Sequence, residues 1–186
     1  DIAEAIKFQK SRAEEAGVQF RLGKQVSLLE IKEFDPENVV FATGAELVWP
    51  ATLAKDSTAY ELRGLSRKLL NQCFKRKGTA ILFDQDHTAG VYAAAELLAQ
   101  SYERVTIVTP KPTIGSKINY ISLIGVMRRL ALLRIDIIPI TVPILLDNET
   151  LLLRNILNGD ETKVGGVTCL TYATPRSVDD RLMVNV

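Results

Sequence analysis

The polar turn from Asp84 to Gly90 lies where a nucleotide-binding protein would carry its phosphate-binding turn. It follows an apolar run, 80–83, and precedes a segment rich in alanine and leucine, 91–100, and a β-branched run, 105–108. This order predicts a strand, a helix and a second strand, a unit that builds parallel sheets. In dinucleotide-binding proteins the first turn of such a unit carries G-x-G-x-x-G, so that the backbone can approach the pyrophosphate.

The glycine positions of that turn hold other residues. When the helix and the second strand are aligned without gaps, the three glycines fall on Asp86, Thr88 and Val91, and Gly90 is one place away. The Cβ of Thr88 occupies space that the phosphate needs. Asp84 and Asp86 add negative charge, and at about 4 Å with an effective dielectric of about 20 each repulsion is on the order of 4 kcal/mol. Micromolar binding is worth roughly 8 kcal/mol. We therefore expect that Asp86 or Thr88 caps the helix and that no ligand binds, and a cofactor bound in altered geometry is the alternative.

The other polar residues near this turn are weaker candidates. Thr109 ends the second strand, where NAD sites often carry an acid, and Lys111 is expected to be a solvated loop lysine rather than a ligand of a 2′-phosphate. His87 is the single histidine, so a multi-histidine metal site is excluded, and we interpret it as a turn residue near a surface or a domain contact. The basic runs 75–77 and 128–129 are expected on solvated faces. We predict no catalytic residue and no metal ligand.

The better candidate for a functional site is the run of small residues Ala42-Thr43-Gly44-Ala45, at the end of an apolar segment that starts at Val39. Small residues let the backbone lie against a nucleotide, and a tight turn at a strand end is the alternative. The predicted cofactor-binding residues are Ala42, Thr43, Gly44, Ala45, Asp84, Thr88, Gly90 and Thr109.

Composition sets broad limits on function. The chain has 186 residues with 47% hydrophobic and 24% charged residues and a net charge of +1, which argues against nucleic acid or an anionic membrane as a partner. Cys73 and Cys169 are far apart and are expected to be buried thiols. The sequence lacks an apolar run of about 18 residues and a signal-peptide pattern, so a cytoplasmic location is expected. Because the chain starts without Met inside an expected helix, we expect a fragment of a longer protein.

The elements expected around the turn define a fold class. Helices are expected over 2–16, 61–74 and 117–134, the last with Met127, Leu130 and Leu133 facing the core. Strands are expected over 18–22, 39–42, 80–83, 105–108, 135–140, 142–146, 151–157 and 167–173, with an extended piece near 25–31, a linker over 46–60 and a hairpin turn at 158–160. The order predicts an α/β fold, a Rossmann-like parallel sheet with helices on both faces and a late antiparallel strand group.

Three passages carry a resemblance to a known family. EAGVQFRLGKQV (15–26) and NVVFATGAELVWP (38–50) resemble the end of the FAD-type half-domain of two-dinucleotide-binding flavoproteins. The passage VTIVTPKPTIGSKINYISLIGVMRRLALLRIDIIP (105–139) is similar to the C-terminal half of the NADH:flavin oxidoreductases related to old yellow enzyme, the trimethylamine dehydrogenase and 2,4-dienoyl-CoA reductase group. The last strand, 167–182, resembles the closing strand of that family, with Pro175 in place of a glycine.

The resemblance implies a domain order and a set of cofactors. Residues 1–50 would be a remnant of the FAD-type half-domain, 51–166 an inserted NAD(P)-type domain with a degenerate glycine motif, and 167–186 a closing strand and return segment. FAD or ADP is implied for the whole protein and NAD(P) is doubtful, while FMN and an iron–sulfur cluster would belong to an N-terminal flavin barrel outside this sequence. That barrel and an electron-transfer protein are the implied partners.

The resulting functional hypothesis is a fragment of a flavin-dependent oxidoreductase that serves as a nucleotide-binding or scaffold domain and is not active alone. Two alternatives stay open. One is a functional NAD(P)H-binding domain with an atypical phosphate turn, and the other is a non-enzymatic interaction module that kept the fold and lost its ligand.

Overall fold

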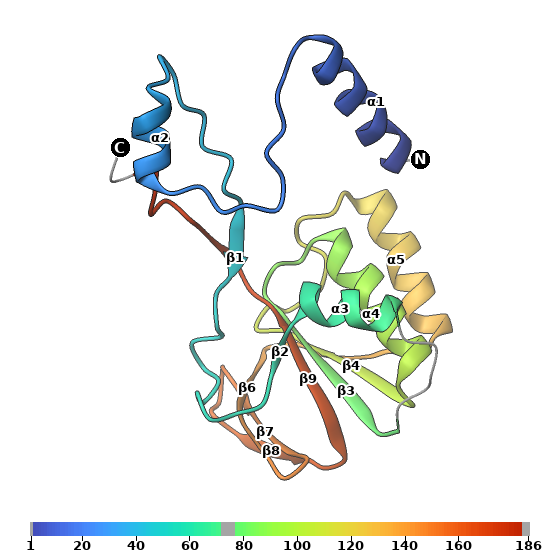
Figure 1. Cartoon of the computed structure of the whole chain (residues 1–186). Coiled ribbons are helices and arrows are strands. Elements are labelled where there is room, and N and C mark those ends of the chain that lie inside the picture. The colour runs from blue at the N-terminus through green and yellow to red at the C-terminus, as the bar shows by residue number, and fades with distance from the viewer. Residues whose placement is uncertain (1, 72–76, 184–186) are drawn as a thin grey trace. The chain divides into compact units, whose positions relative to one another are not determined.

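The computed structural model describes residues 2–71 and 77–183 and falls into two units (Figure 1). Unit 1 comprises Asp1–Thr43 and Asp179–Val186, and unit 2 comprises Gly44–Val178. The domain limits expected from the resemblance, 50/51 and 166/167, stay a prediction. Cys73 and most of the basic run 75–77 lie outside the described residues.

Unit 2 is built around a parallel sheet. In the described residues its strands have the order β2-β9-β3-β4-β5, and every neighbouring pair is parallel. The strands are β2 (Tyr60–Glu61), β3 (Thr79–Asp84), β4 (Arg104–Val108), β5 (Asp136–Ile138) and β9 (Val167–Ala173). Because parallel strands end at the same edge, the residues that follow β3, β4 and β9 meet there, which is where α/β proteins bind ligands.

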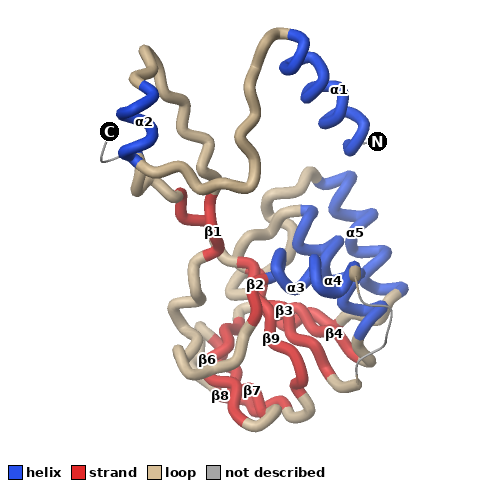
Figure 2. The backbone as a smooth tube through the Cα atoms, viewed as in Figure 1, coloured by secondary structure: helices blue, strands red, loops and turns tan. Residues whose placement is uncertain are grey.

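Three helices cover one face of this sheet (Figures 1 and 2). They are α3 (Leu62–Leu70), α4 (Ala89–Ser101) and α5 (Tyr120–Leu132). Their buried side chains pack against Ala80 and Leu82 of β3 and against Val105 and Ile107 of β4. The core side of α5 differs from the expected one, because Met127 is 51% exposed while Leu130 is buried.

The opposite face is covered by an antiparallel sheet of β6 (Thr141–Asp147), β7 (Thr150–Asn155) and β8 (Glu161–Val164). Ile81 and Phe83, which alternate with Ala80 and Leu82 along β3, are fully buried in this second cluster. The α/β class, the Rossmann-like parallel sheet and the late antiparallel group are therefore confirmed. The arrangement differs from helices on both faces, because α3, α4 and α5 pack on one face and the antiparallel sheet covers the other.

Two short strands lie where the chain passes between the units. β1 (Ala45–Leu47) pairs antiparallel with β10 (Arg176–Val178), with Ala45 opposite Val178. The chain enters unit 2 at Gly44, directly before β1, and leaves it after Val178. β1 was not expected, because it is only three residues long and its partner is distant in sequence. β10 lies within the last strand expected over 167–182, but the structure divides that stretch into β9 and β10.

Unit 1 contains α1 (Ile2–Glu15) and α2 (Leu28–Phe34). Ser27 caps α2, because its hydroxyl accepts from the amide of Glu30 while the Glu30 carboxylate accepts from the amide of Ser27. This helix replaces much of the extended piece expected near 25–31. None of the residues of unit 1 whose burial is described is buried, and large apolar side chains such as Phe8 and Phe34 are mostly exposed.

The strands expected over 18–22 and 39–42 are corrected by the structure. Both segments are described without strand pairing, and Val40 is 90% exposed. An apolar β-branched run forms a strand only when a neighbour satisfies its backbone groups, and within the described residues neither run has such a neighbour.

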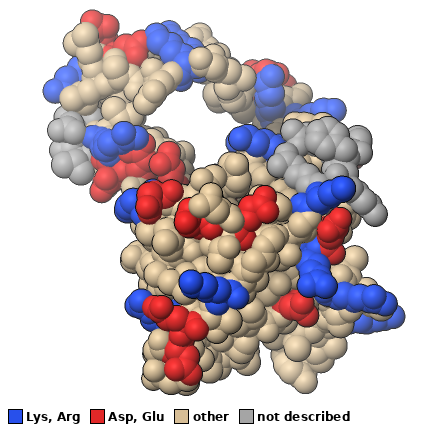
Figure 3. Space-filling view, turned by 90° about the horizontal axis from the view of Figure 1, so that it is seen from below, with Lys and Arg blue, Asp and Glu red and all other residues tan. Residues whose placement is uncertain are grey.

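The surface charge and the lengths of the helices bear on binding to nucleic acid and to membranes. Acidic and basic side chains are interspersed on the face seen in Figure 3, so that face carries no field of a single sign. Within the described ranges, the helices all fall short of the length and apolar character that crossing a membrane requires.

Candidate functional site

The turn between β3 and α4 is organised around the carboxylate of Asp84, the last residue of β3. Its side chain is fully buried. One oxygen, Oδ1, accepts hydrogen bonds from the amide of Asp86 at 3.1 Å and from the amide of His87 at 2.8 Å. These are amides of the turn that a bound phosphate would contact in a dinucleotide-binding protein. A carboxylate of the chain itself occupies them here.

The second oxygen of Asp84 is held by Tyr92, which the sequence analysis did not single out. The hydroxyl of Tyr92 donates to Asp84 Oδ2 at 2.7 Å and accepts from the amide of Gly115 at 2.6 Å. Tyr92 is fully buried, and burial together with the negative charge of Asp84 raises the pKa of its hydroxyl strongly. The hydroxyl therefore remains a donor and joins β3, α4 and the loop before α5.

His87 lies in the same buried cluster, although a surface position was one of those expected for it. Its backbone is left-handed, with φ at 56°, a conformation in which histidine is enriched among non-glycine residues. The side chain is 2% exposed, with Nδ1 3.6 Å from Asp84 Oδ2 and Nε2 3.4 Å from Thr109 Oγ1. Among the described residues, none forms a hydrogen bond with Nδ1. The backbone carbonyl of His87 accepts from the amide of Lys117 at 3.3 Å.

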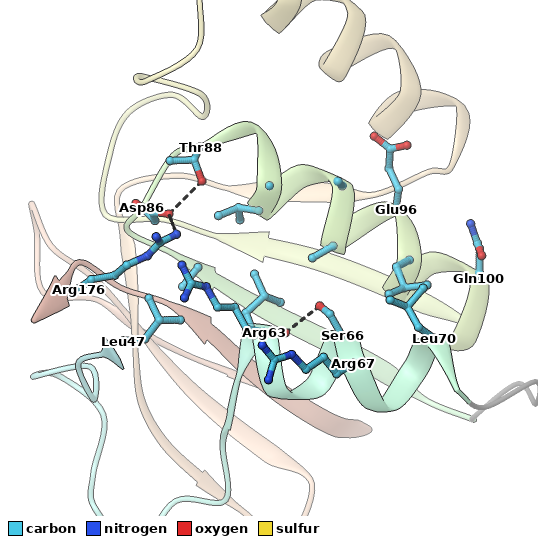
Figure 4. Close-up of a pocket in the computed structure, with 17 residues that line it drawn as sticks. Leu47, Arg63, Ser66, Arg67, Leu70, Asp86, Thr88, Glu96, Gln100 and Arg176 are labelled. Carbon is cyan, nitrogen blue, oxygen red and sulfur yellow. Dashed lines mark hydrogen bonds and ion pairs between the residues drawn. The ribbon is translucent and has the colours of Figure 1, made fainter. Parts of the chain in front are cut away.

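Asp86 forms a second, less buried charge cluster. Its carboxylate accepts from the Thr88 hydroxyl at 2.9 Å and from Lys117 Nζ at 3.1 Å, and Arg176 lies 3.9 Å away (Figure 4). Burial acts to raise the pKa of Asp86, but the hydrogen bonds from Thr88 and Lys117 and the positive charges of Lys117 and Arg176 outweigh it and lower the pKa. The negative charge expected to repel a phosphate is thus largely compensated, and the internal bonds of Asp84 are the stronger obstacle.

Thr88 begins α4 without capping it. Its backbone is extended, as an N-cap residue requires, but its hydroxyl is donated to Asp86 and makes no cap hydrogen bond to the helix. The side-chain cap expected at this helix is therefore absent at Thr88, and Gly90 is exposed in the first turn. Val91, at the third glycine position, is buried in the core beneath α4.

The remaining residue predicted at this edge is Thr109, which follows β4. It is fully buried, and its hydroxyl accepts from the amide of Lys111 at 3.2 Å as well as lying near His87. Lys111 is exposed, in line with a solvated loop lysine. The structure thus brings Asp84, Thr88, Gly90 and Thr109 to one edge of the sheet.

The run 42–45 straddles the boundary of the two units. Ala42, Thr43 and Gly44 are exposed, and Thr43 Oγ1 donates to the carbonyl of Asp179 at 2.6 Å within unit 1. Gly44 has φ of 79°, and a Cβ built there would meet nothing within 4 Å. Ala45 is the first residue of β1. The backbone at Gly44 is therefore open to close approach by another molecule.

A cleft of about 760 Å³ lies between α3 and α4 (Figure 4). Arg63 and Arg67 of α3 and Arg176 of β10 line it, together with apolar side chains that include Leu62, Val91 and Leu97. None of these arginines belongs to the basic runs 75–77 and 128–129 that were considered as phosphate ligands, so they were not predicted. The spacing of Arg63 and Arg67, four residues apart in an expected helix, was the available signal, since it places both on one face.

The arrangement gives no sign of a metal centre. Among the described residues, none of the clusters of His, Cys, Asp and Glu has the three members that could hold an ion. Cys169 is buried, as expected. In chemical terms, the edge of the sheet offers a closed hydrogen-bond network, and the cleft offers open guanidinium groups.

Comparison with known proteins gives a fold likeness only. No protein-family model matches the sequence, and no curated protein matches it. Histamine dehydrogenase from Rhizobium sp. 4-9 is similar in structure, with a TM-score of 0.74 and 17% identity over 87% of this chain. A 2-naphthoyl-CoA reductase gives 0.76 with 18% identity over 98% of the chain. Thioredoxin reductase from T. acidophilum gives 0.59 with 10% identity over 76% of the chain.

These likenesses are partial on the side of the solved proteins. The chain spans 26% of the histamine dehydrogenase chain, 26% of the naphthoyl-CoA reductase chain and 45% of the thioredoxin reductase chain. The three proteins are oxidoreductases by name, and at these identities the similarity establishes a shared fold.

Proposed function

We propose that this chain is the nucleotide-domain region of a larger flavin-dependent oxidoreductase, in which it acts as a scaffold and docking domain and does not itself exchange hydride with a nicotinamide. The observation that carries the scaffold role is the occupied turn. The Oδ1 atom of Asp84 takes both amides that a pyrophosphate would need, and Tyr92 holds the other oxygen in place. A dinucleotide would have to displace a buried, fully hydrogen-bonded carboxylate.

The assignment to a larger flavoenzyme rests on two supports of a different kind. The sequence resembles the C-terminal half of the NADH:flavin oxidoreductases, and the fold is shared with two oxidoreductases of which it spans 26% of each chain. Unit 1 adds a physical reason. Because none of its residues of described burial is buried, its exposed apolar side chains, Phe8 and Phe34 among them, fit a surface that packs against other protein.

We propose the run 42–45 as the surface of this region that approaches the FAD or ADP of the whole protein. The open space and positive φ at Gly44 support this, because a nucleotide can lie against backbone only where no Cβ intervenes. Asp84, Thr88, Gly90 and Thr109 belong to the closed edge of the sheet, where we propose that no nicotinamide cofactor binds.

Nuclear magnetic resonance with ¹⁵N labelling tests whether a nicotinamide cofactor binds at the turn amides. NADH, NADPH, ADP and FAD are each titrated into the chain while the amide signals of Asp86 and His87 are followed. We expect neither signal to shift with NADH or NADPH, because both amides are already bound to Asp84. A saturable shift of both with NADH would overturn the closed turn and favour a working NAD(P)H domain.

The flavoenzyme assignment has its own test. The protein that contains this chain, purified at its natural length, is expected to show the absorption of an oxidised flavin and to lose it on reduction with dithionite. A pure, folded protein without flavin absorption, before and after incubation with FAD and FMN, would contradict the assignment and favour an interaction module.

A further inference from the structure

The cleft between α3 and α4 carries positive charge that no acid among the described residues neutralises. Asp86 is already bonded to Lys117 and lies close to Arg176. The other acid that lines the cleft, Glu96, forms an ion pair with Arg129 at 2.8 Å.

Arg63 and Arg67 lie on the α3 side of the cleft. Neither forms an ion pair with any of the residues that the structure describes, and both are exposed on the wall of the cleft. They are four residues apart on α3, so their like charges lie on one face and repel each other. In Figure 4 the Arg63 side chain extends toward the end of the cleft that Arg176 also reaches. Such a grouping is stabilised by an anion that accepts hydrogen bonds from several guanidinium groups.

We propose that this cleft binds a phosphate monoester with an apolar body. The phosphate is held by Arg63 and Arg67, with Arg176 at the same end, and the body lies along Val91 and Leu97. A guanidinium group matches phosphate oxygens in pairs, and two arginines without an ion pair to any described residue favour a dianion over a singly charged group. The proposal goes beyond the scaffold role, since it uses neither the amides of the turn nor the sequence resemblance.

The size and lining of the cleft select the class of ligand. A volume of about 760 Å³ lies within the range of small-molecule sites, roughly 300–1,000 Å³. Inorganic phosphate alone would leave the apolar wall in water, and a neutral apolar molecule would leave the arginines without an anion. A phosphate monoester with an apolar body provides an anion for the arginines and covers the apolar wall of the cleft.

The test uses 4-methylumbelliferyl phosphate, with 4-methylumbelliferone and inorganic phosphate as its two halves. Calorimetry and ¹⁵N spectra of the whole chain measure binding. We expect the ester to bind at least 10-fold more tightly than either half and to shift the amides of Arg63 and Arg67. Equal binding of ester and umbelliferone, or no binding of the ester, would overturn the proposal.

Variants locate the site. The double variant Arg63→Gln with Arg67→Gln keeps good helix formers at exposed positions and is expected to weaken the ester at least 10-fold. Arg128→Gln on α5, an exposed arginine that does not line the cleft, is the matched control and should bind like the parent chain. Ala93→Glu places a negative charge on the opposite wall and should also weaken the ester. Unchanged affinity in both cleft variants, with a native ¹⁵N spectrum, would refute the site.

Discussion

The hydroxyl of Tyr92 lies 2.7 Å from Asp84 Oδ2, and the two fully buried side chains join the end of β3 to the first half of α4. The same hydroxyl accepts from the amide of Gly115, so one phenol oxygen serves three segments of the chain. The other oxygen of Asp84, Oδ1, accepts hydrogen bonds from the amides of Asp86 and His87 in the turn. A turn that binds phosphate in related architectures has here become part of the protein interior.

Replacement of Tyr92 by phenylalanine tests the energetic weight of that oxygen. The change leaves Asp84 Oδ2 and the Gly115 amide without a partner in a buried place, which costs about 1–3 kcal/mol of unfolding free energy. Urea denaturation followed by circular dichroism measures it. Tyr120→Phe, at a tyrosine that is 76% exposed on α5, is the control and should change stability little. Equal stability of the two variants would show that the hydroxyl of Tyr92 contributes nothing measurable to the free energy of unfolding.

Asp86 makes stability depend on pH with a definite sign. Its pKa is lowered in the folded protein below the ordinary value of 3.8, mainly because the hydrogen bonds and charges of Thr88, Lys117 and Arg176 outweigh burial. The stabilisation from its charge is therefore complete above about pH 3.8 and is lost as the pH falls through the lowered value. We expect Asp86→Asn to reduce unfolding free energy by about 1 kcal/mol at pH 7 and by less at pH 3.

Denaturation of parent and variant at several pH values measures that difference. Asp56→Asn, at an exposed aspartate in the loop before β2, is the control and should show a smaller difference with no such trend. A difference between parent and Asp86→Asn that grows toward low pH would contradict the assigned direction of the pKa.

Gly78 is placed where both backbone and packing require glycine. Its φ is 91°, and a Cβ there would lie 2.5 Å from Thr168 Cγ2 and 2.7 Å from its Oγ1. Gly159 has a similar φ of 77° with nothing within 4 Å, so Gly159→Ala measures the backbone term alone, about 1 kcal/mol. We expect Gly78→Ala to cost about 1–3 kcal/mol more, because the Thr168 side chain, whose hydroxyl donates to the carbonyl of Lys77, must move. Equal losses in thermal unfolding would show that the Thr168 side chain yields freely.

The central unit of the fold could be predicted because its local signals agree with its tertiary setting. The apolar run of β3 and the alanine-rich α4 have clear periodicity and composition, and both lie where they were expected. What covers each face of the sheet could not be predicted, since Ile81 and Leu82 are equally apolar and either face suits a helix or a sheet. The run at Val39 and Val40 resembles a strand in sequence, but the pairing partner that a strand needs is not a local property.

The position of the unusual turn could be predicted from the sequence, but the hydrogen bonds that close it could not. The missing glycines identify the turn as unusual, and the acids in it suggest repulsion of phosphate. Asp84 points inward, binds the amides of Asp86 and His87, and accepts from the hydroxyl of Tyr92, eight residues away. The contact with Tyr92 requires α4 to be packed on the sheet, so it is not a local property of the turn. Arg63, Arg67 and Arg176 come together only in the tertiary structure, because β10 is more than 100 residues from α3.

The internal carboxylate leads to a prediction about restoring a phosphate site. Asp86→Gly with Thr88→Gly removes side-chain bulk and one charge, but Asp84 still accepts from both turn amides, so we expect no NADH binding at the turn. Adding Asp84→Ala frees the two amides for a phosphate. It is expected to lower the free energy of unfolding by about 3 kcal/mol, because the hydroxyl of Tyr92 loses its acceptor. We expect the triple variant alone to give a saturable shift of the His87 amide with NADH. Binding of NADH by the double variant would show that side-chain bulk, and not the buried carboxylate, closes the turn. A folded triple variant whose His87 amide does not shift with NADH would show that freeing the two amides is not sufficient for binding.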